Sequence, residues 1–454
     1  MSNDITFAQV RSAVLRKGAF ALCFPLCTFG LALSGRAQEP HIITFDAPGA
    51  DTKPGDFDGT YPGSINFWGV ITGSYQDTNS TYHGFVRSPE GTFTTFEAPG
   101  ADLGSYNGTA PCCTNDLGVI TGSYYDKTGF SHGFVRSPEG KFTSFDVPGV
   151  GGYGTTPLAM NLEGAIVGYY TDSNFSFHAF LRSPDGKFTT WIGPDACTGN
   201  GSEGCYGSSA SNINALGTVA GGFEDNSGNF VDHGLIRRPD GALTTFDVPG
   251  AGTGSYQGSG CPGCAKGLNQ LGAIAGIYSD ANSVSHGFLR NPNGKFTTFD
   301  APGAGTCSYQ GTGCPSDCPT SLNDLGAIMG SYIDTNSVLH GYLRSPNGNI
   351  ATVDPVGSVF TWSSGLNDFG AITGYYADAN NVYHGFLRIP CGWWCEGNDQ
   401  GTTAATPVSP APILQGPAAN QVNPGFSGAV SPMLRPFGGR LMPWYRIVGA
   451  QTLK

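Results

Sequence analysis

A unit of about 50 residues recurs along most of this chain and restricts its fold more than any other feature. The clearest copy is GLNQLGAIAGIYSDANSVSHGFLRNPNGKFTTFDAPGA, residues 267–304. Within it, residues 273–278, 286–290 and 296–300 alternate apolar with small or polar side chains, which is typical of short β-strands. A fourth short strand is expected to end near Leu268, and no copy contains the 3.6-residue apolar period of a helix.

The residues between these strands are those of tight turns. Asn, Pro and Gly supply fixed or positive φ angles in residues 269–272 and 291–294. A four-stranded meander of this kind cannot bury both of its faces alone. Stacking successive copies around a common axis buries them, and a repeat of ~40–50 residues with four strands is typical of a β-propeller blade.

The copies can be counted from three residues that recur once in each: the His of the third strand, the Asn of the first turn and the Asp that closes the second strand. Each occurs seven times, so the sequence predicts seven blades. The histidines are His83, His132, His178, His233, His286, His340 and His384. The asparagines are Asn66, Asn115, Asn161, Asn214, Asn269, Asn323 and Asn367. The aspartates are Asp77, Asp126, Asp172, Asp225, Asp280, Asp334 and Asp378.

The fourth strand predicts how the ring of blades closes. Its first copy, residues 41–46, precedes every other blade element, and no fourth strand follows His384. We therefore expect residues 42–46 to pair with residues 385–388, which removes the exposed edges of an open array. The predicted fold is an all-β, seven-bladed β-propeller of four-stranded blades within residues 38–395, with blades near 60–101, 106–150, 153–193, 206–251, 256–304, 309–356, and 360–390 together with 41–46.

The two ends of the chain differ from the repeats in composition. Residues 1–37 have the pattern of a secretion signal peptide, because basic residues precede an apolar run and Gly35-Arg36-Ala37 offers a small-x-small cleavage site. Residues 396–454 are rich in Pro, Gly and Ala and are expected to form a flexible tail. No transmembrane span is expected once the signal is removed.

The net charge of the chain restricts the kinds of molecule that it can bind. The net charge of −12 becomes −15 when residues 1–37, with four basic residues and one acid, are removed. An acidic protein of this kind repels polyanions, so we expect no nucleic-acid partner. Residues 433–454 differ, because no acid follows Asp399 and four basic residues stand among aromatic ones: Arg435, Arg440, Arg446 and Lys454. This end is either a solvated terminus, a contact for an anionic surface, or a segment that folds back onto the acidic ring.

Eleven of the thirteen cysteines follow the signal region, and most lie in connections between blades. Disulfides between near neighbours are expected in a secreted protein. The expected pairs are Cys197 with Cys205, Cys261 with Cys264, two of Cys307, Cys314 and Cys318 with the last two favoured, and Cys391 with Cys395. The odd number leaves a thiol that is unpaired or bonded to another molecule. The alternative is a zinc site made by Cys261, Cys264, Cys314 and Cys318, whose spacing permits it without being specific.

Seven histidines beside seven carboxylates resemble catalytic groups, but a residue present in every blade serves something that every blade needs. We expect each third-strand His to form a hydrogen-bond bridge within its blade, to a neighbouring strand or to the Asp-Asn-Ser turn. The turn aspartates are expected to cap their own turns, because the Gly and distal Glu of a calcium loop are missing. The third-strand arginines are expected to pair with nearby acids.

Aromatic residues fall in the passages from one blade's fourth strand to the next blade's first strand. In a propeller these passages share one face with the turns between second and third strands. Two roles are open for the side chains: stacking on sugar rings at that face, or packing between blades as anchors of the loops. The residues are Tyr106, Tyr153, Tyr206, Tyr256, Tyr309 and Trp362.

The repeated unit I-N-x-x-G-x-I-x-G-x-Y-x-D…H-G/A-F-x-R-x-P-x-G-x-F-T-T-F-D-x-P-G-A resembles the HAF repeat of bacterial extracellular proteins, named after its His-Ala-Phe core. Residues 178–180 carry this tripeptide. The other copies replace Ala by Gly, and two of them also have Leu235 or Tyr342 in place of Phe. The resemblance covers residues 41–390, and residues 191–194 depart from it. It implies a secreted bacterial protein of unassigned biochemical role, and it brings no catalytic residue.

Three functions are compatible with these patterns. The leading interpretation is a secreted, periplasmic or cell-surface propeller without catalysis, metal or cofactor, which binds a glycan or protein through its loop-rich face. The second is an extracellular polysaccharide lyase or hydrolase, which would need a cluster of acid, His or Tyr residues in one blade only. The third is a structural component of the cell envelope that is attached through the tail.

Overall fold

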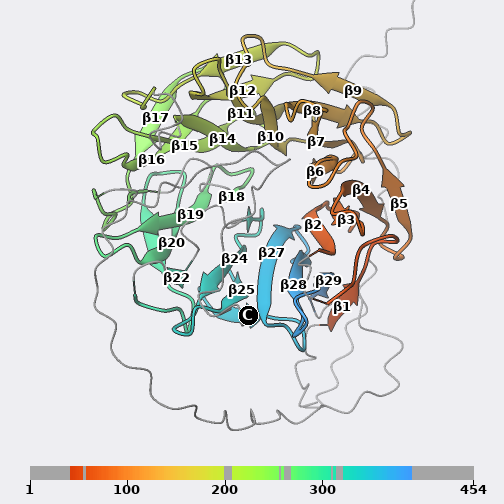
Figure 1. The fold of residues 1–454 in the computed structure, drawn as a ribbon. Coiled ribbons are helices and arrows are strands. Elements are labelled where there is room, and N and C mark those ends of the chain that lie inside the picture. Colours follow the sequence, from red (N-terminus) through yellow and green to blue (C-terminus); the bar gives the residue numbers. More distant parts are fainter. Residues whose placement is uncertain are drawn as a thin grey trace, which may run out of the picture. The chain divides into compact units, whose positions relative to one another are not determined.

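The computed structural model describes residues 41–54, 58–198, 207–254, 257–259, 267–307, 310–312 and 321–390. Every helix or strand assigned within these ranges is a β-strand. The described residues form five four-stranded sheets and one nine-stranded sheet (Figure 1). The expected signal peptide, residues 1–37, and the expected tail, residues 396–454, lie outside the described residues.

The first four sheets are antiparallel meanders whose strands follow one another in sequence. The first sheet contains β2 (Thr60–Ile65), β3 (Ile71–Gln76), β4 (Tyr82–Arg87) and β5 (Phe93–Phe96). The second contains β6 (Thr109–Thr114), β7 (Ile120–Tyr125), β8 (Ser131–Arg136) and β9 (Phe142–Phe145). The third contains β10 (Thr155–Met160), β11 (Ile166–Thr171), β12 (Phe177–Arg182) and β13 (Phe188–Trp191). The fourth contains β14 (Ser208–Ile213), β15 (Val219–Glu224), β16 (Asp232–Arg237) and β17 (Leu243–Phe246).

The nine-stranded sheet contains two further copies of the same unit. One copy is β18 (Gly267–Leu268), β19 (Ile274–Ser279), β20 (Ser285–Arg290) and β21 (Phe296–Phe299). The other is β23 (Ser321–Leu322), β24 (Ile328–Ile333), β25 (Leu339–Arg344) and β26 (Ile350–Val353). Strand β22 (Gly311–Thr312) joins them, because it pairs with both β20 and β24. In residues 267–304 the strand boundaries lie within one residue of those predicted from the alternating pattern.

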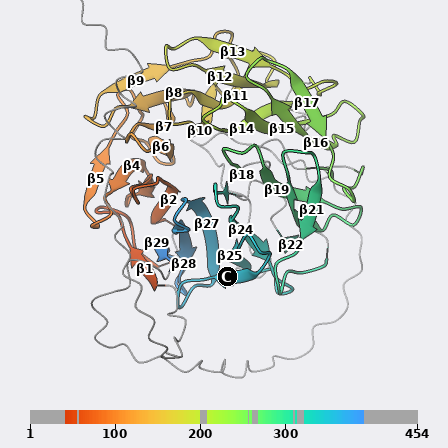
Figure 2. The same ribbon diagram turned by 180° about the vertical axis from the view of Figure 1, so that it is seen from behind.

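The last sheet combines the two ends of the repeat region. It contains β27 (Phe360–Leu366), β28 (Ile372–Ala377), β29 (Tyr383–Ile389) and β1 (His41–Phe45). Strand β1 pairs antiparallel with β29, with Ile42 opposite Arg388 and Phe45 opposite Gly385. The predicted joining of the N-terminal strand to the last sheet is therefore confirmed. Figures 1 and 2 show the resulting propeller-like succession of sheets from its two sides.

The core lies between neighbouring sheets. At one position of the third strand, a large side chain is 0–2% exposed in every copy: Phe85, Phe134, Phe180, Leu235, Phe288, Tyr342 and Phe386. One core cluster joins Phe145 and Val147 of the second sheet to Ile166, Tyr170 and Phe180 of the third. Burying a side chain of this size stabilises by about 1.5–3 kcal/mol, so the stability is distributed over the interfaces between sheets.

Polar contacts also join consecutive sheets. Thr109, the first residue of β6, accepts a hydrogen bond through Oγ1 from the Ala98 amide at 2.9 Å. Gly108 precedes it with φ 123°, and a Cβ at this residue would lie 1.9 Å from the Tyr82 carbonyl oxygen. Only glycine permits both this φ and this approach of two backbones. The Gly-Thr start of a first strand is therefore a contact between sheets.

Six third-strand arginines lie over aromatic rings, where acid partners were expected. The guanidinium carbon of Arg87 lies 4.7 Å from the ring centroid of Phe45, which belongs to the preceding sheet. Arg237 lies in the same way over Trp191 at 4.9 Å. The same contact occurs at Arg136, Arg182, Arg290 and Arg344. Buried and half-buried guanidinium groups are attracted to the negative faces of aromatic rings, so these arginines join sheets rather than strand edges.

Candidate functional site

The connections between sheets meet the turns between second and third strands, as expected for a loop-rich face. The Tyr106 amide donates to the Ser80 carbonyl at 2.7 Å. This bond joins the connection between β5 and β6 to the turn after β3. The Asp102 amide donates to the Tyr125 carbonyl at 2.7 Å, at the end of β7 in the following sheet. The connection is therefore held by hydrogen bonds from both of the sheets that it joins.

The three predicted aromatic residues that the structure describes lie in different surroundings. Tyr106 is 50% exposed in its connection. Tyr153 is half-buried, and its ring meets that of Phe175 edge-on at 5.0 Å. Trp362 differs from the prediction, because it lies inside β27, is 7% exposed and stacks on Tyr375. Its side chain packs in the first strand and is not presented by a connection. Tyr206, Tyr256 and Tyr309 lie outside the described residues.

Polar side chains accompany the most exposed of these rings. The Asn107 amide Nδ2 donates to Asp102 Oδ2 at 2.8 Å. Leu103, between them, is 55% exposed. Tyr106 itself has φ 63°, a backbone conformation that residues other than glycine rarely adopt. We call Asp102, Leu103, Tyr106 and Asn107 the Tyr106 platform, since they present an aromatic ring, an apolar chain, a carboxylate and an amide together.

The histidines form one arrangement that recurs along the chain. The His286 ring stacks on Tyr278 at 5.0 Å, with Nδ1 2.8 Å from Asp300 and Nε2 3.7 Å from the turn residue Asp280. Two acids also flank His83, His132, His233, His340 and His384. The fourth-strand acids in these copies are Glu97, Asp146, Asp247, Asp354 and Asp46. His178 contacts Asp172 at 3.2 Å, and Ile192 stands at the sequence position of the second acid.

The turn aspartates cap the turns in which they lie. Asp280 Oδ1 accepts hydrogen bonds from the amides of Asn282 at 2.8 Å and Val284 at 2.9 Å. Equivalent bonds occur at Asp77, Asp126, Asp172, Asp225, Asp334 and Asp378. Within the part of the chain that the structure describes, no group of three His, Cys, Asp or Glu side chains is placed to hold a metal ion.

Folding raises the pKa values of third-strand histidines and lowers those of the turn aspartates. The hydrogen bond to Asp300 raises the pKa of His286 above 6.5, and the equivalent bonds raise the pKa of His83, His233 and His340. Desolvation acts to raise the pKa of Asp280, but the hydrogen bonds from Val284 and Asn282 outweigh it and lower this pKa below 3.8. The folded state therefore favours the charged form of both groups.

These shifts predict a stability maximum between about pH 4 and 6.5. A raised histidine pKa stabilises fully below the unfolded pKa, and this contribution is lost as the pH rises through the folded pKa. A lowered aspartate pKa stabilises above the unfolded pKa, and this contribution is lost as the pH falls through the folded pKa. Calorimetric melting from pH 3 to 9 measures both limbs, and His286→Gln should reduce the fall on the alkaline side. An unchanged alkaline limb in that variant contradicts the assignment.

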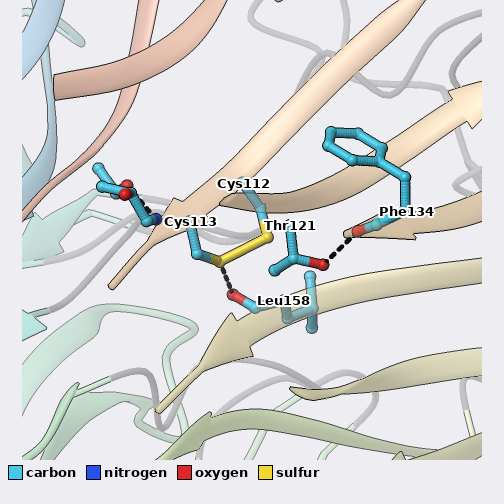
Figure 3. The surroundings of a disulfide bond; sticks show 7 residues. Cys112, Cys113, Thr121, Phe134 and Leu158 are labelled. Atoms are coloured by element: carbon cyan, nitrogen blue, oxygen red, sulfur yellow. Dashed lines mark hydrogen bonds between the residues drawn. A yellow bond between two sulfur atoms is a disulfide. The ribbon is translucent and has the colours of Figure 1, made fainter. Parts of the chain in front are cut away.

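The cysteines give a pair that the sequence did not suggest. Cys112 and Cys113 are adjacent in β6 and form a disulfide at a bulge in its pairing with β7 (Figure 3). The Cys113 sulfur also contacts the Leu158 carbonyl of the next sheet at 3.1 Å. Cys197 is disulfide-bonded, and Cys307 has a free, exposed thiol. The other expected disulfide or zinc residues lie outside the described residues: Cys205, Cys261, Cys264, Cys314, Cys318, Cys391 and Cys395.

The first-turn asparagines, counted in the sequence only as landmarks, link one sheet to the next. Asn115 Nδ2 donates to the carbonyls of Asn161 at 3.3 Å and Leu162 at 3.2 Å, and its Oδ1 accepts from the Val119 amide at 3.0 Å. The same donation to the next copy is made by Asn66, Asn161, Asn214 and Asn323, and Asn367 donates to Asn66. The repeat revealed the residue but not that its amide reaches the neighbouring sheet.

A cavity of about 250 Å³ is lined by these asparagine turns, including Asp116, Asp324 and Asp368. The turns connect first and second strands, so they lie at the end of the sheets opposite the loop-rich face. Two residues after the asparagine, six turns carry large apolar side chains that are 58–74% exposed: Trp68, Leu117, Leu216, Leu271, Leu325 and Phe369. We call these six residues the apolar crown. Its signal in the sequence is a large apolar residue repeated inside a turn.

The fourth sheet contains a pair of buried acidic residues at positions that other sheets fill with other residues. Glu224 and Asp232 are opposite each other in β15 and β16 and are 2% and 7% exposed. Burial first, and then the charge of Glu224, raises the pKa of Asp232 well above 3.8, and Asp232 Oδ1 has no hydrogen-bond partner. The equivalent pairs elsewhere include Gln76 with Tyr82 and Ser279 with Ser285. An unrepeated cluster of this kind is not visible in the sequence, because its two residues stand eight positions apart in different strands.

Neither a protein-family model nor a curated protein sequence matches the chain. Among solved structures, the BP39L lectin from Burkholderia pseudomallei is similar, with a TM-score of 0.48, 10% identity, and coverage of 73% of this chain and 95% of the lectin. TolB from Acinetobacter baumannii gives 0.38 at 13% identity over 74% and 65% of the two chains. A six-bladed fucose-recognising lectin from Aleuria aurantia gives 0.34 at 12% over 62% and 93%.

Identities and TM-scores of this size assign the chain neither a family nor a ligand. The propeller-like architecture rests on the sheet topology of the chain itself. The resemblance to the HAF repeat stays a prediction. No helix among the described residues is long and apolar enough to span a membrane.

Proposed function

We propose that the chain is a secreted, seven-bladed propeller of the HAF type that binds a neutral glycan, without catalysis, through its loop-rich face. The Tyr106 platform carries this proposal. Its aromatic ring is half exposed on a backbone of unusual conformation, which the hydrogen bond to Ser80 holds. An outlier of this kind is maintained only where the surroundings fix it, and such outliers concentrate at binding sites.

The chemistry of the platform suits a sugar. An aromatic ring offers an apolar surface for the C–H face of a pyranose, and its hydroxyl offers a polar edge. Asp102 and Asn107 hold each other in one orientation at 2.8 Å within the same connection as the ring, and a carboxylate and an amide are groups that bind sugar hydroxyls. The net charge of −12 disfavours polymers of uronic acids, so a neutral glycan is the better partner.

Repetition supports a polymeric ligand. The next connection presents Tyr153 with Phe175, which is 40% exposed. Tyr206, Tyr256 and Tyr309 occupy corresponding places in the sequence. Several weak sites on one face bind a repeating polymer far more tightly than one site does, because each later contact forms within the same complex.

The test is a glycan array followed by calorimetric titration with the glycans that bind. We expect Tyr106→Ala to weaken binding by about tenfold, the size of one lost aromatic stacking contact. Leu271→Ala is the matched control, because this side chain is 74% exposed at the opposite end of the sheets and should leave affinity unchanged. The proposal is refuted if no glycan on the array binds, or if wild type and Tyr106→Ala bind with equal affinity.

A polysaccharide hydrolase or lyase is the second candidate, favoured by Glu224 and Asp232. A carboxyl kept protonated beside a second carboxyl is the pair that glycosidic bond cleavage uses as acid and base. The release of reducing ends from any bound glycan would identify this activity, whereas a binding protein retains the glycan unchanged.

A further inference from the structure

The apolar crown is unusual for solvated turns. Single exposed leucines are common on proteins, but contiguous exposed apolar side chains mark a docking surface. Turn positions ordinarily carry Gly, Asn, Asp or Ser, since these residues satisfy turn geometry and remain hydrated. Here Leu216, Leu271 and Leu325 are each at least 70% exposed, and Trp68 and Phe369 are 65% and 58% exposed at the same position of two further turns.

The same turns are acidic. The crown turns contain Asp116, Asp324 and Asp368, the remaining asparagine turn contains Glu163, and none of these turns contains Lys or Arg. Carboxylate oxygens of three of these residues accept backbone amides of the preceding turn: Asp116 from Phe67 at 2.8 Å, Asp324 from Gln270 at 2.8 Å and Asp368 from Asp324 at 3.0 Å. These bonds hold the acids in place around the cavity. A partner that matches this surface must combine apolar side chains with positive charge.

The chain itself leaves the described region at this surface. In the first sheet, Gly69 of the first turn faces Pro89 of the turn that follows the third strand. In the last sheet, the Cβ position of Gly370 lies 3.8 Å from Pro390 in the same way. Pro390, the last described residue, is thus next to the turn that contains Phe369, at the edge of the crown.

The end of the sequence has the required chemistry. Residues 433–454 contain Trp444, Tyr445 and Ile447 among four basic residues and carry no acidic side chain. An extended chain gains about 3.3 Å per residue, so residues 391–432 are long enough to reach any point of the crown. Tethering of this kind raises the effective concentration to roughly millimolar, and weak contacts then suffice.

We propose that residues 433–454 dock on the apolar crown, with the aromatic and aliphatic side chains on the leucines and the arginines beside Asp116, Asp324 and Asp368. Two other occupants fit less well. A second copy of the crown would bring two sets of acids face to face, and an anionic lipid surface would repel the same acids. The contact is independent of glycan binding, because the platform lies at the opposite end of the sheets.

The experiment uses the full chain with the photo-crosslinking residue p-benzoylphenylalanine in place of Trp444. After irradiation, mass spectrometry should locate crosslinks within one chain, in the turns that contain Leu216, Leu271 and Leu325. The variant Leu216→Ser/Leu271→Ser/Leu325→Ser should lower the crosslink yield by about tenfold, since it removes the apolar contact area. These side chains are exposed, so the variant should melt like the parent protein.

Controls separate the alternatives. Leu103→Ser, on the loop-rich face, should leave the crosslink yield unchanged, and the triple variant should bind glycan as the wild type does. Crosslinks located elsewhere, or a yield that the triple variant does not change, overturn the proposal. Crosslinks between light and heavy isotope-labelled copies would assign the crown to a second copy instead. Crown-dependent binding to vesicles of phosphatidylcholine and anionic phosphatidylglycerol would assign it to a lipid surface, and either result overturns the proposal.

Discussion

Gly108→Ala is expected to lower the free energy of unfolding by about 3–5 kcal/mol. A Cβ at this residue would lie 1.9 Å from the Tyr82 carbonyl oxygen and 2.8 Å from its carbon. Both are backbone atoms, so no side-chain rotation relieves the overlap. The strand must move away from the first sheet, and the hydrogen bond from the Tyr82 amide to the Asn107 carbonyl at 2.8 Å is lost with it.

Gly129→Ala separates the effect of contact from the effect of backbone conformation. Gly129 also has a positive φ, 79°, but no atom lies within 4 Å of its Cβ position. It should lose only about 1 kcal/mol, the difference between glycine and alanine in a left-handed turn. Urea unfolding of both variants measures the difference. Equal losses would show that the approach of the two sheets at Gly108 is not as tight as the structure has it.

The strands of each repeat and the pairing that completes the last sheet could be predicted from the sequence. The strands in residues 267–304 were predictable because alternation of side chains directly reflects the two faces of a strand. The pairing of Ile42 with Arg388 was predictable because an unmatched fourth strand at one end and a missing one at the other leave one complementary arrangement. Both inferences need only the repeat and the rule that exposed edges are avoided.

Contacts between repeats were not predictable in the same way. Arg87 was expected beside an acid but lies over Phe45, a residue of another sheet. Trp362 was expected in a connection but lies inside β27, because the boundary between connection and strand is not visible in a segment without alternation. The first-turn asparagines and the crown residues could be recognised in the sequence because they recur at the same position of successive copies. Their direction, toward a neighbour or toward solvent, depends on how sheets are placed next to one another.

Asn115→Ala is expected to lower the free energy of unfolding by about 3 kcal/mol, since it removes four hydrogen bonds of a buried side chain. Asn115 Nδ2 donates to the carbonyls of Asn161 and Leu162, and Oδ1 accepts the amides of Leu117 and Val119. Alanine leaves these backbone groups without the partner, and two of them belong to the following sheet. The variant therefore weakens the turn and the contact between sheets together.

Two further asparagines help to distinguish the contribution of the turn from that of the contact between sheets. Asn79→Ala affects an exposed turn residue that hydrogen-bonds within its own turn, and it should lose well under 1 kcal/mol. Asn367→Ala removes the donation to Asn66, which joins the last sheet to the first, and the bond from the Ala371 amide within its own turn. With two hydrogen bonds lost in place of four, it should lose about half as much free energy of unfolding as Asn115→Ala. Denaturant unfolding of the three variants compares them directly. If Asn367→Ala behaved like Asn79→Ala, the donation to Asn66 would add little to the contact between the last and first sheets, and the asparagines would only shape their own turns.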